Sequence, residues 1–324
     1  MAWTFTEVQS VTNDYFATKE AVDIYYKESF FLNYFMDKKM GLFDRPEGGD
    51  RIRINLDYDL PPGGFFTKGT ALNSDQREII NAAYTQWKHV YGSGTIHMVD
   101  EISNNGEMAK VKLILAQAKG AQKKARRLLA ENIYNSAADG AEEITGLNAA
   151  TGTTTTLAYE SLSEDTVVSS DGTKPWTGRT TTTAESISLD VIRTMRSTAK
   201  INDSAEGKPD VGLTTETLYN VIAGRLQVQQ RFTQDTDTVK AGFVNLWFEG
   251  MLLAVDDYAG SGNFYALNKN YIGWAIHTDG FFQRFPWVSL IVANQPAKSM
   301  KIFWHGNLIN SNRKAHIRHS GLTA

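Results

Sequence analysis

The side chains that most often perform catalysis or bind metals are dispersed along this sequence of 324 residues. The six histidines are His89, His97, His277, His305, His316 and His319. Only His316 and His319 stand close together, three residues apart, and no obvious third ligand accompanies them. Because a catalytic or metal site requires several groups that converge, we expect the histidines to be isolated surface residues.

The carboxylates and glycines give equally little sign of an active site. Asp256 and Asp257 follow an apolar run and could form a metal site or a carboxylate pair. Adjacent residues on a strand point to opposite faces, so a turn or a salt bridge is the better interpretation. The segments GSGT and AGSGN lack the strand-to-helix context of a phosphate loop, and no HExxH, GxSxG or Walker A pattern occurs. The sequence therefore predicts no enzyme, no metal site and no cofactor.

The composition excludes further classes of protein. A formal net charge of -3 and a pI near 6.1 argue against a dedicated nucleic-acid binder, although one face could still be basic. The absence of cysteine excludes disulfide frameworks, zinc ribbons and cysteine nucleophiles, and it fits folding in a reducing cytoplasm. We expect no secretory signal at the N-terminus and no membrane helix, because no run of roughly 18 apolar residues occurs.

Two extended segments and the loop between them predict a long β-hairpin. Residues 51–58, RIRINLDY, alternate apolar and polar side chains with the period of a strand. Residues 60–76 are rich in proline and glycine and predict a loop, and residues 78–92 predict a second extended segment. Because an isolated hairpin is only marginally stable in water, we expect this arm to lie on another surface.

A long helix is predicted over residues 104–137, where Asn104 and Glu107 have the spacing of a capping box. At ~1.5 Å per residue it would be roughly 50 Å long, about the diameter of a compact globule of this size, so we expect a flat subunit. Alanines in its apolar stripe would let another backbone approach closely. The predicted stripe is Met108, Val111, Ile114, Leu115, Ala118, Ala121, Ala125, Leu128, Leu129 and Ile133. The predicted basic face is Lys112, Lys119, Lys123, Arg126 and Arg127.

The remaining segments predict a mixed α+β protein. Residues 146–186 are rich in threonine, serine and glycine, but large apolar residues interrupt them and favour ordered loops and short strands. From residue 243 to the C-terminus, short apolar runs between turns predict strands. The further predicted helices are 17–40, 185–200 and 214–232.

In order and size, these parts resemble the major capsid proteins of tailed double-stranded DNA phages, which have the HK97 fold. Residues 48–92 are similar to the extended loop of that family, and residues 102–135 are similar to its spine helix. The segments PDVGLTTETLYNVIAGRLQVQQRF, GFVNLWFEGMLLAVDD and GNFYALNKNYI resemble the strand-helix-strand pattern of capsid axial domains. The resemblance covers nearly the whole chain, and its specificity lies in the order of the parts, since no single motif is diagnostic.

The resemblance implies an α+β, HK97-like capsid fold with four parts. An N-terminal arm and the following helix would occupy residues 1–45, and an extended loop would occupy residues 46–100. A peripheral domain with the long spine helix would comprise residues 101–140 and 280–324. An axial domain would comprise residues 141–279.

The resemblance also implies a structural protein that self-assembles into the icosahedral or prolate head shell around the phage genome. The basic face of the long helix would border either the packaged DNA or an acidic patch on a neighbouring chain; a solvated charged face is the alternative. Some family members cross-link a lysine of the extended loop to a neighbour's asparagine, but we find no match for that asparagine and expect no cross-link. Intersubunit contacts of the extended loop would involve Arg51, Arg53, Phe65, Phe66 and Lys68.

The partners implied by the resemblance are those of a phage head. The chain would form hexamers and pentamers in a shell, with a separate scaffolding protein during assembly, because the sequence begins almost directly with the arm. A portal protein, packaged double-stranded DNA and, in some heads, a decoration protein complete the set, and no membrane is involved. The protein would belong to the virion and would assemble in the cytoplasm of the bacterial host.

Two other interpretations remain open from the sequence. The first shares the fold: an encapsulin-like nanocompartment shell that encloses cargo enzymes. The second belongs to another class: a β-rich, glycan-binding surface protein, suggested by the threonine-rich stretch and the seven tryptophans.

Overall fold

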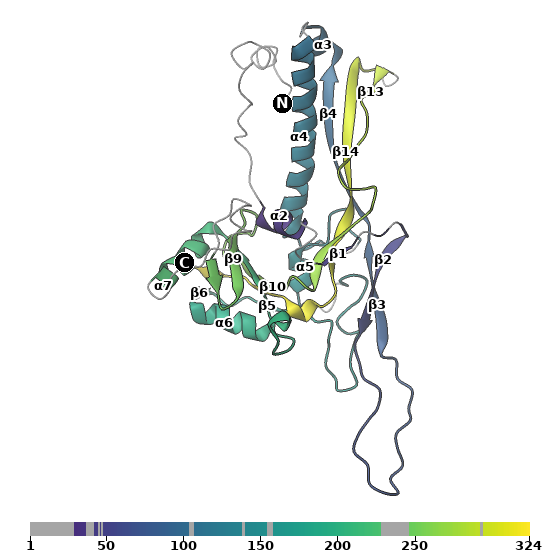
Figure 1. The fold of residues 1–324 in the computed structure, drawn as a ribbon, viewed down its shortest axis with the longest axis vertical. Helices are drawn as coiled ribbons and strands as arrows, with labels where there is room; N and C mark the ends of the chain where they lie inside the picture. The colour runs from purple at the N-terminus through teal and green to yellow at the C-terminus, as the bar shows by residue number, and fades with distance from the viewer. Residues whose placement is uncertain are drawn as a thin grey trace. The chain divides into compact units, whose positions relative to one another are not determined.

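A computed structural model describes residues 29–36, 42–44, 46, 48–103, 107–137, 140–153, 158–227, 246–291 and 294–324. The chain divides into two compact units (Figure 1). Within the described residues, unit 1 contains residues 89–129 and 277–305, and unit 2 contains the rest. The division therefore falls inside the helix α4 (Glu107–Ile133) and the strand β14 (Ala297–Asn310).

Unit 1 is a helix packed against strands. The first part of β14 pairs antiparallel with β12 (Gln283–Arg284) and β13 (Val288–Ser289), and β14 also pairs with β4 (Lys88–His97). A short helix, α3 (Met98–Ser103), follows β4 directly and leads toward α4. Ala121 of α4 is buried with Met300 and Ile302 of β14, and Phe282 and Trp287 pack against this cluster.

The backbones of β4 and α4 approach unusually closely, which the alanines of the helix had predicted. A Cβ atom on Gly92 would lie 2.0 Å from the carbonyl oxygen of Ala121, and one on Gly94 would lie 3.0 Å from that of Gln117. Side chains larger than hydrogen at these strand positions would force the helix away. Figure 1 shows the strand running beside the helix.

The buried face of α4 differs from the predicted stripe at its N-terminal end. Leu113 is buried, whereas Leu115 is 54% exposed and Ile114 is also exposed. The expected burial of Ile114 and Leu115 is therefore wrong. Three apolar residues in succession, Leu113 to Leu115, leave the phase of the helix undetermined, and the period set by Ala121, Ala125 and Leu129 selects Leu113. Asn104 and the side chains of Glu107, Met108, Val111 and Lys112 lie outside the described residues.

Unit 2 is built on a six-stranded sheet in the order β5-β15-β10-β7-β9-β8. These strands are β5 (Thr180–Thr181), β7 (Val211–Thr214), β8 (Leu246–Phe248), β9 (Met251–Val255), β10 (Phe264–Leu267) and β15 (Ile317–His319). Every residue of β7 and β10 is buried, as expected for central strands. β7 and β9 pair in parallel, and both α7 (Glu216–Gln227) and β8 lie between them in the sequence.

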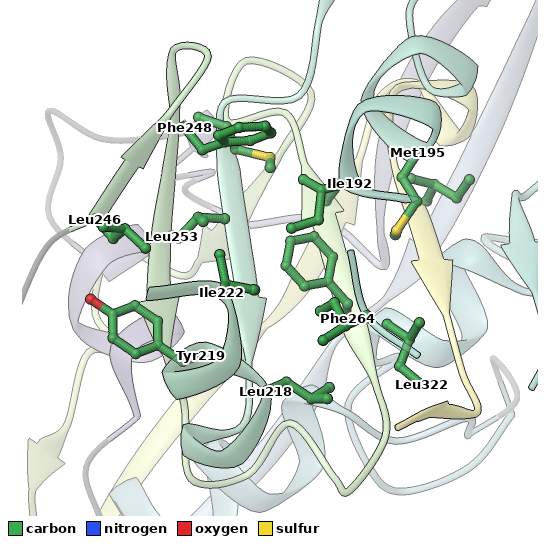
Figure 2. Close-up of a cluster of buried hydrophobic side chains, with 14 of the residues drawn as sticks. Ile192, Met195, Leu218, Tyr219, Ile222, Leu246, Phe248, Leu253, Phe264 and Leu322 are labelled. Carbon is green, nitrogen blue, oxygen red and sulfur yellow. The ribbon is translucent and has the colours of Figure 1, made fainter. Parts of the chain in front are cut away.

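The core of this sheet is formed with two helices. Figure 2 shows Ile192 and Met195 of α6 (Leu189–Thr198), together with Leu218 and Ile222 of α7, gathered around Phe264 of β10. The N-terminus of α6 is capped because the Ser188 hydroxyl accepts a hydrogen bond from the Val191 N–H at 3.2 Å. The helices predicted at residues 185–200 and 214–232 are confirmed with shorter bounds: residues 185–186 and Thr214 belong to strands, and residues 228–232 lie outside the described part.

Besides the short pair β6 (Glu185–Ser186) and β16 (Leu322–Thr323), two larger groups of strands belong to unit 2. The end of β14 pairs antiparallel with β11 (Ile272–Ile276), and β11 pairs in parallel with β1 (Leu42–Asp44). The predicted hairpin is β2 (Arg51–Asp57) and β3 (Ile80–Gln86), with Arg51 opposite Gln86 and Asp57 opposite Ile80. Further small elements are α2 (Phe30–Met36), α5 (Leu147–Thr151), and the 3-10 turns η2 (Ala205–Gly207) and η4 (Arg313–Ala315).

A buried carboxylate anchors α2 in unit 2. Asp256 is fully buried, and it accepts hydrogen bonds from the Ser29 hydroxyl at 2.8 Å and the Phe31 N–H at 3.0 Å. Its second oxygen accepts the Tyr258 N–H at 3.0 Å. Burial raises the pKa of Asp256, and these three donors oppose that rise. Among a metal site, a carboxylate pair, a turn and a salt bridge, the turn is therefore the correct interpretation of Asp256. Its carboxylate caps α2 and accepts the N–H of the turn residue Tyr258.

A glycine-to-alanine pair tests the close approach of β4 and α4. Gly92→Ala is expected to lower the free energy of unfolding by about 1–3 kcal/mol, the usual cost of overpacking a core. Gly120→Ala is the matched control: Gly120 is an exposed position of α4 with no atom near its absent Cβ, and alanine there should raise helix stability by up to about 1 kcal/mol. Chemical denaturation measures both values. Equal effects of the two substitutions would contradict the packing described above.

Candidate assembly surfaces

The tip of the β2–β3 hairpin exposes apolar side chains. Leu60 is 76% exposed, Phe66 is 67% exposed, and Phe65 is fully exposed to solvent. The base of the hairpin, in contrast, is anchored: Ile52 packs with Ala275 and Ile309, and Leu56 and Ala83 join a buried cluster of the threonine-rich segment. Grouped, exposed apolar residues on a rigidly rooted arm are typical of a surface that another molecule covers.

The charged residues predicted on this arm are also exposed. Arg51 and Arg53 lie on the solvent side of β2, opposite the buried Ile52 and Leu56, which confirms the alternating pattern. Arg51 approaches Asp50 at 3.7 Å, an exposed pair that contributes little. Lys68 lies at the tip, and all three residues are available for contacts outside the chain.

The root of the loop is fixed by a residue that sequence reasoning missed. Asp59 accepts hydrogen bonds from the Leu60 N–H at 2.8 Å and from the hydroxyls of Ser169 and Ser170 at 3.0 and 2.9 Å. The Leu60 bond first, and then the serine bonds, lower the pKa of Asp59 to about 2. A carboxylate opposite paired serines 110 positions away leaves no local sequence signal.

The basic residues of α4 form an exposed strip in unit 1. Lys119, Lys123, Arg126 and Arg127 are all exposed, and Lys124, which the prediction omitted, is exposed beside them. The Arg126 guanidinium lies 5.5 Å from the centre of the Phe282 ring, a cation–π contact that orients it. The side chain of Lys112 lies outside the described residues.

The expectation of six isolated surface histidines is wrong. In unit 1 the Nδ1 atoms of His89 and His305 are 2.6 Å apart, so one ring donates to the other and at least one is neutral. Burial lowers the pKa of His305, and the charges of His89 and His277 lower it further. In unit 2, His316 and His319 are buried, and His319 Nε2 lies 2.7 Å from Glu185 Oε1.

His316 is a structural residue with a defined tautomer. Its Nδ1 accepts the Asn268 N–H at 3.1 Å, so its Nε2 carries the proton and donates to Asn310 Oδ1 at 3.2 Å. Burial lowers its pKa from 6.5 to about 3. Asn268 lies 48 positions before His316 and Asn310 lies 6 positions before it, so the HIRH segment alone does not reveal these partners.

The described residues contain neither a cluster of metal-ligating side chains nor a helix suited to span a membrane. No three histidine, aspartate or glutamate side chains converge there as metal ligands would. Among the same residues, no helix combines the length and the apolar character needed to cross a bilayer. Trp176, Trp274 and Trp304 are buried in the core, so these three of the seven tryptophans offer no surface to a glycan.

The fold matches those of capsid chains along its whole length. The cyanophage A-1(L) capsid asymmetric unit aligns with a TM-score of 0.65 and 16% identity, covering 97% of this chain and 99% of that chain. The capsid of Myoviridae phage XM1 aligns with a TM-score of 0.59 and 11% identity, covering 94% and 95%. The holo-SrpI encapsulin complex from Synechococcus elongatus aligns with a TM-score of 0.52 and 10% identity, covering 99% and 96%. No protein-family model and no curated protein matches the sequence.

These similarities establish the fold. The chain has an α+β, HK97-like capsid fold, as the order of its parts had predicted. At identities of 10–16%, the agreement concerns architecture and does not identify which side chains act.

The buried His316 predicts a pH dependence of stability. The pKa of His316 is about 3 in the folded state, against 6.5 for a histidine that is not buried. As the pH falls, the unfolded state therefore binds the proton before the folded state does. The contribution of neutral His316 to the free energy of unfolding is complete above pH 6.5 and is lost progressively toward pH 3. Between pH 6.5 and 4.5 we expect a loss of about 2 kcal/mol from this residue.

Denaturation of wild type and His316→Gln at both pH values measures that contribution. The variant should be less stable at pH 7 but should lose about 2 kcal/mol less on acidification. His97→Gln, at an exposed histidine of β4, should keep the pH slope of the wild type. A slope in His316→Gln that matches the wild type would contradict the buried neutral tautomer.

Proposed function

We propose that the chain is the major capsid protein of a tailed double-stranded DNA phage and that it self-assembles into the head shell. The observation that carries the proposal is the match of fold over 97% of this chain and 99% of a cyanophage capsid chain. The match extends over the hairpin and the long helix as well as the core. This extent supports the proposal that both parts serve in a shell here, as they do in the matched capsid chain. Purified protein examined by negative-stain electron microscopy should show shells, tubes or capsomers; a dispersed monomer under all conditions would refute the proposal.

The extended hairpin supplies the contact between neighbouring subunits. Its tip presents Phe65 and Phe66 to solvent with Lys68 close by in the loop, and Arg51 and Arg53 are exposed on the strand that leads to the loop. In a closed shell each subunit extends one arm to a neighbour and receives an arm from another neighbour. Every such contact surface is therefore occupied. Several weak contacts made by one subunit act together and raise the overall affinity.

The basic strip of α4 faces either the genome or an acidic surface of a neighbouring subunit. Lys119, Lys123, Arg126 and Arg127 lie within about three turns of helix. Each exposed charge contributes little alone at physiological salt, where screening acts over about 8 Å. A lattice of such strips against a dense polyanion acts differently, because neutralised phosphates release their counterions.

The remaining partners follow from the same proposal. Hexamers and pentamers of this chain would form an icosahedral or prolate head, with a separate scaffolding protein and a portal protein during assembly. The protein would belong to the virion, would assemble in the host cytoplasm, and would enclose double-stranded DNA, with a decoration protein in some heads. The arm, extended loop, peripheral domain and axial domain keep the residue ranges predicted from the sequence as part of this proposal, and catalysis has no part in it.

A nanocompartment shell is the second candidate, because the encapsulin complex shares the fold at a TM-score of 0.52. The two functions differ in what the shell encloses. Particles purified from the native source distinguish them: packaged DNA supports the phage head, and a protein cargo supports the nanocompartment.

Removal of the hairpin tip tests the arm. Deletion of residues 61–72 should leave a folded subunit, because these residues contribute almost nothing to the core, but closed shells should not form. A double substitution, Phe65→Ser with Phe66→Ser, should reduce assembly in the same direction. Val168→Ser, at another exposed apolar residue of unit 2, is the matched control and should assemble normally. Circular dichroism checks folding and electron microscopy checks assembly; normal particles from the deletion would show that the arm is misassigned.

Neutralisation of the basic strip tests its role in genome retention. The triple variant Lys119→Gln, Lys123→Gln and Arg127→Gln should form empty shells but retain less DNA, most visibly at low divalent-cation concentration. The same change of charge at Lys174, Lys208 and Lys269 in unit 2 is the control. The ratio of full to empty particles and the temperature of DNA release measure the effect.

Each other result for the triple variant has a definite meaning. If empty shells do not form, the strip is a contact between subunits. If both assembly and DNA retention equal those of the control, the strip is a solvated surface.

A further inference from the structure

A pocket of about 390 Å³ opens in unit 2 beside the 3-10 turn η4. Four stretches far apart in the sequence line it: the end of β2, the threonine-rich segment, the residues after α6, and the residues after β14. Its apolar wall includes Leu56, Val167 and Pro175. Facing them are three cationic side chains, Arg179, Lys200 and Lys314, and the polar residues Ser311 and Asn312.

The charges of the pocket are not balanced within the described residues. Lys200 pairs with Asp203 at 2.5 Å and is thereby neutralised. Arg179 donates to the carbonyl oxygen of Thr198, and neither Arg179 nor Lys314 forms an ion pair with a carboxylate in the described part of the chain. Asp57, an exposed residue, also lines the pocket and forms no ion pair with either cation, and Asp171 acts on Lys314 only beyond ion-pair distance.

Two half-buried cations therefore share one site. Burial lowers the pKa of Arg179, and burial together with the Arg179 charge lowers the pKa of Lys314. Proteins usually pair charges that they remove from water, because an unpaired charge in a poorly solvated site is unfavourable. The neighbouring Arg313 shows the usual solution, since its guanidinium donates to four backbone carbonyl oxygens. Arg179 and Lys314 lack such a set and would gain from an anion.

The backbone that carries Lys314 is held in place before any ligand arrives. The Asn312 side chain accepts the Lys314 N–H at 3.1 Å, and the Asn312 N–H donates to the Asn310 side chain at 3.0 Å. Arg179 is fixed on the other side by Thr198, and its backbone carbonyl accepts the Arg318 N–H at 3.0 Å. A site whose donors are already positioned spends less free energy on ordering them when a ligand binds.

We propose that this pocket binds a phosphate-type oxyanion, with Arg179 and Lys314 as its direct ligands. A guanidinium offers paired N–H donors that match the oxygens of phosphate, and an ammonium adds a point charge. The apolar wall leaves room for an organic part of the ligand, and the volume falls within the range of small-molecule sites. The phosphate can belong to a free molecule or to a nucleic-acid backbone, and the site does not depend on the capsid function proposed above.

Binding of pyrophosphate to the unassembled protein tests the proposal. Calorimetric titration in phosphate-free buffer should show saturable binding to the wild type. Lys314→Gln should weaken it at least tenfold, Lys314→Arg should retain most of it, and Lys301→Gln, at an exposed lysine of unit 1, should have no effect. No saturable binding to the wild type, or equal binding by Lys314→Gln, would overturn the proposal.

A measurement without ligand separates a binding role from a structural one. If Lys314 is kept for a ligand, Lys314→Gln should melt at the same or a higher temperature than the wild type in phosphate-free buffer. Pyrophosphate should then raise the melting temperature of the wild type more than that of the variant. A variant that melts lower without ligand and is stabilised equally by pyrophosphate would assign Lys314 a structural role and reject the proposal.

A short single-stranded oligonucleotide distinguishes the two sources of phosphate. Loss of oligonucleotide binding in Lys314→Gln identifies a nucleic-acid ligand, and loss of pyrophosphate binding alone identifies a free phosphate; both outcomes support the site. A density map of an assembled particle with a carboxylate of a second copy against Lys314 Nζ would overturn it, because the anion would then be part of the shell itself.

Discussion

Burial of the Arg313 guanidinium is the constraint on which the organisation of unit 2 depends. Its side chain is 2% exposed, and its N–H groups donate to carbonyl oxygens of Ala149, Ala150, Gly152 and Trp176. The Tyr159 ring lies 4.9 Å beneath it, and Glu164 lies 3.8 Å away. One charge thus determines the path of the threonine-rich segment, since moving any of these carbonyls would leave a buried cation unsatisfied. Gly178 follows from this arrangement, because a Cβ there would lie 2.1 Å from the Gly152 oxygen.

That segment in turn fixes the root of the hairpin. Tyr159 and Trp176, which contact Arg313, belong to the same buried cluster as Leu56 and Ala83 of β2 and β3. Ser169 and Ser170 then hold Asp59 at the point where β2 ends and the loop begins. A hairpin of this length would be marginal alone, so its stability comes from these contacts at its base. The tip can therefore remain apolar and exposed without weakening the fold of the subunit.

The extent to which sequence predicts this structure follows from how local each interaction is. The alternation in β2 and the i, i+4 spacing of Ala121, Ala125 and Leu129 reveal their buried faces directly, because period and burial coincide. Leu113 to Leu115 form an unbroken apolar run that does not itself define a face, and the buried face of Ala121, Ala125 and Leu129 selects Leu113. Arg313, Asp59 and His316 each have partners 48 to 164 residues away, so no short window of sequence contains their full set of contacts. The exposed charges of α4 and the exposed hairpin tip, which are the proposed assembly surfaces, were predictable from the sequence. The cationic pocket was not, because four distant segments of the chain form it together.

The chemistry of the hairpin tip explains how an exposed apolar arm can be selective. Pro61 and Pro62 lack backbone N–H donors, and residues 58–79 form no strand, so the tip offers no continuous edge to which a foreign strand could pair. Contact must then be made through side chains such as Phe65 and Phe66, whose fit depends on the shape of the receiving surface. In the proposed contact, apolar surface supplies the attraction, and the nearby charge of Lys68 disfavours a partner that carries the same sign. Under the proposed function, many weak contacts of this kind act together where many copies present the matching surface, as a self-assembling shell requires.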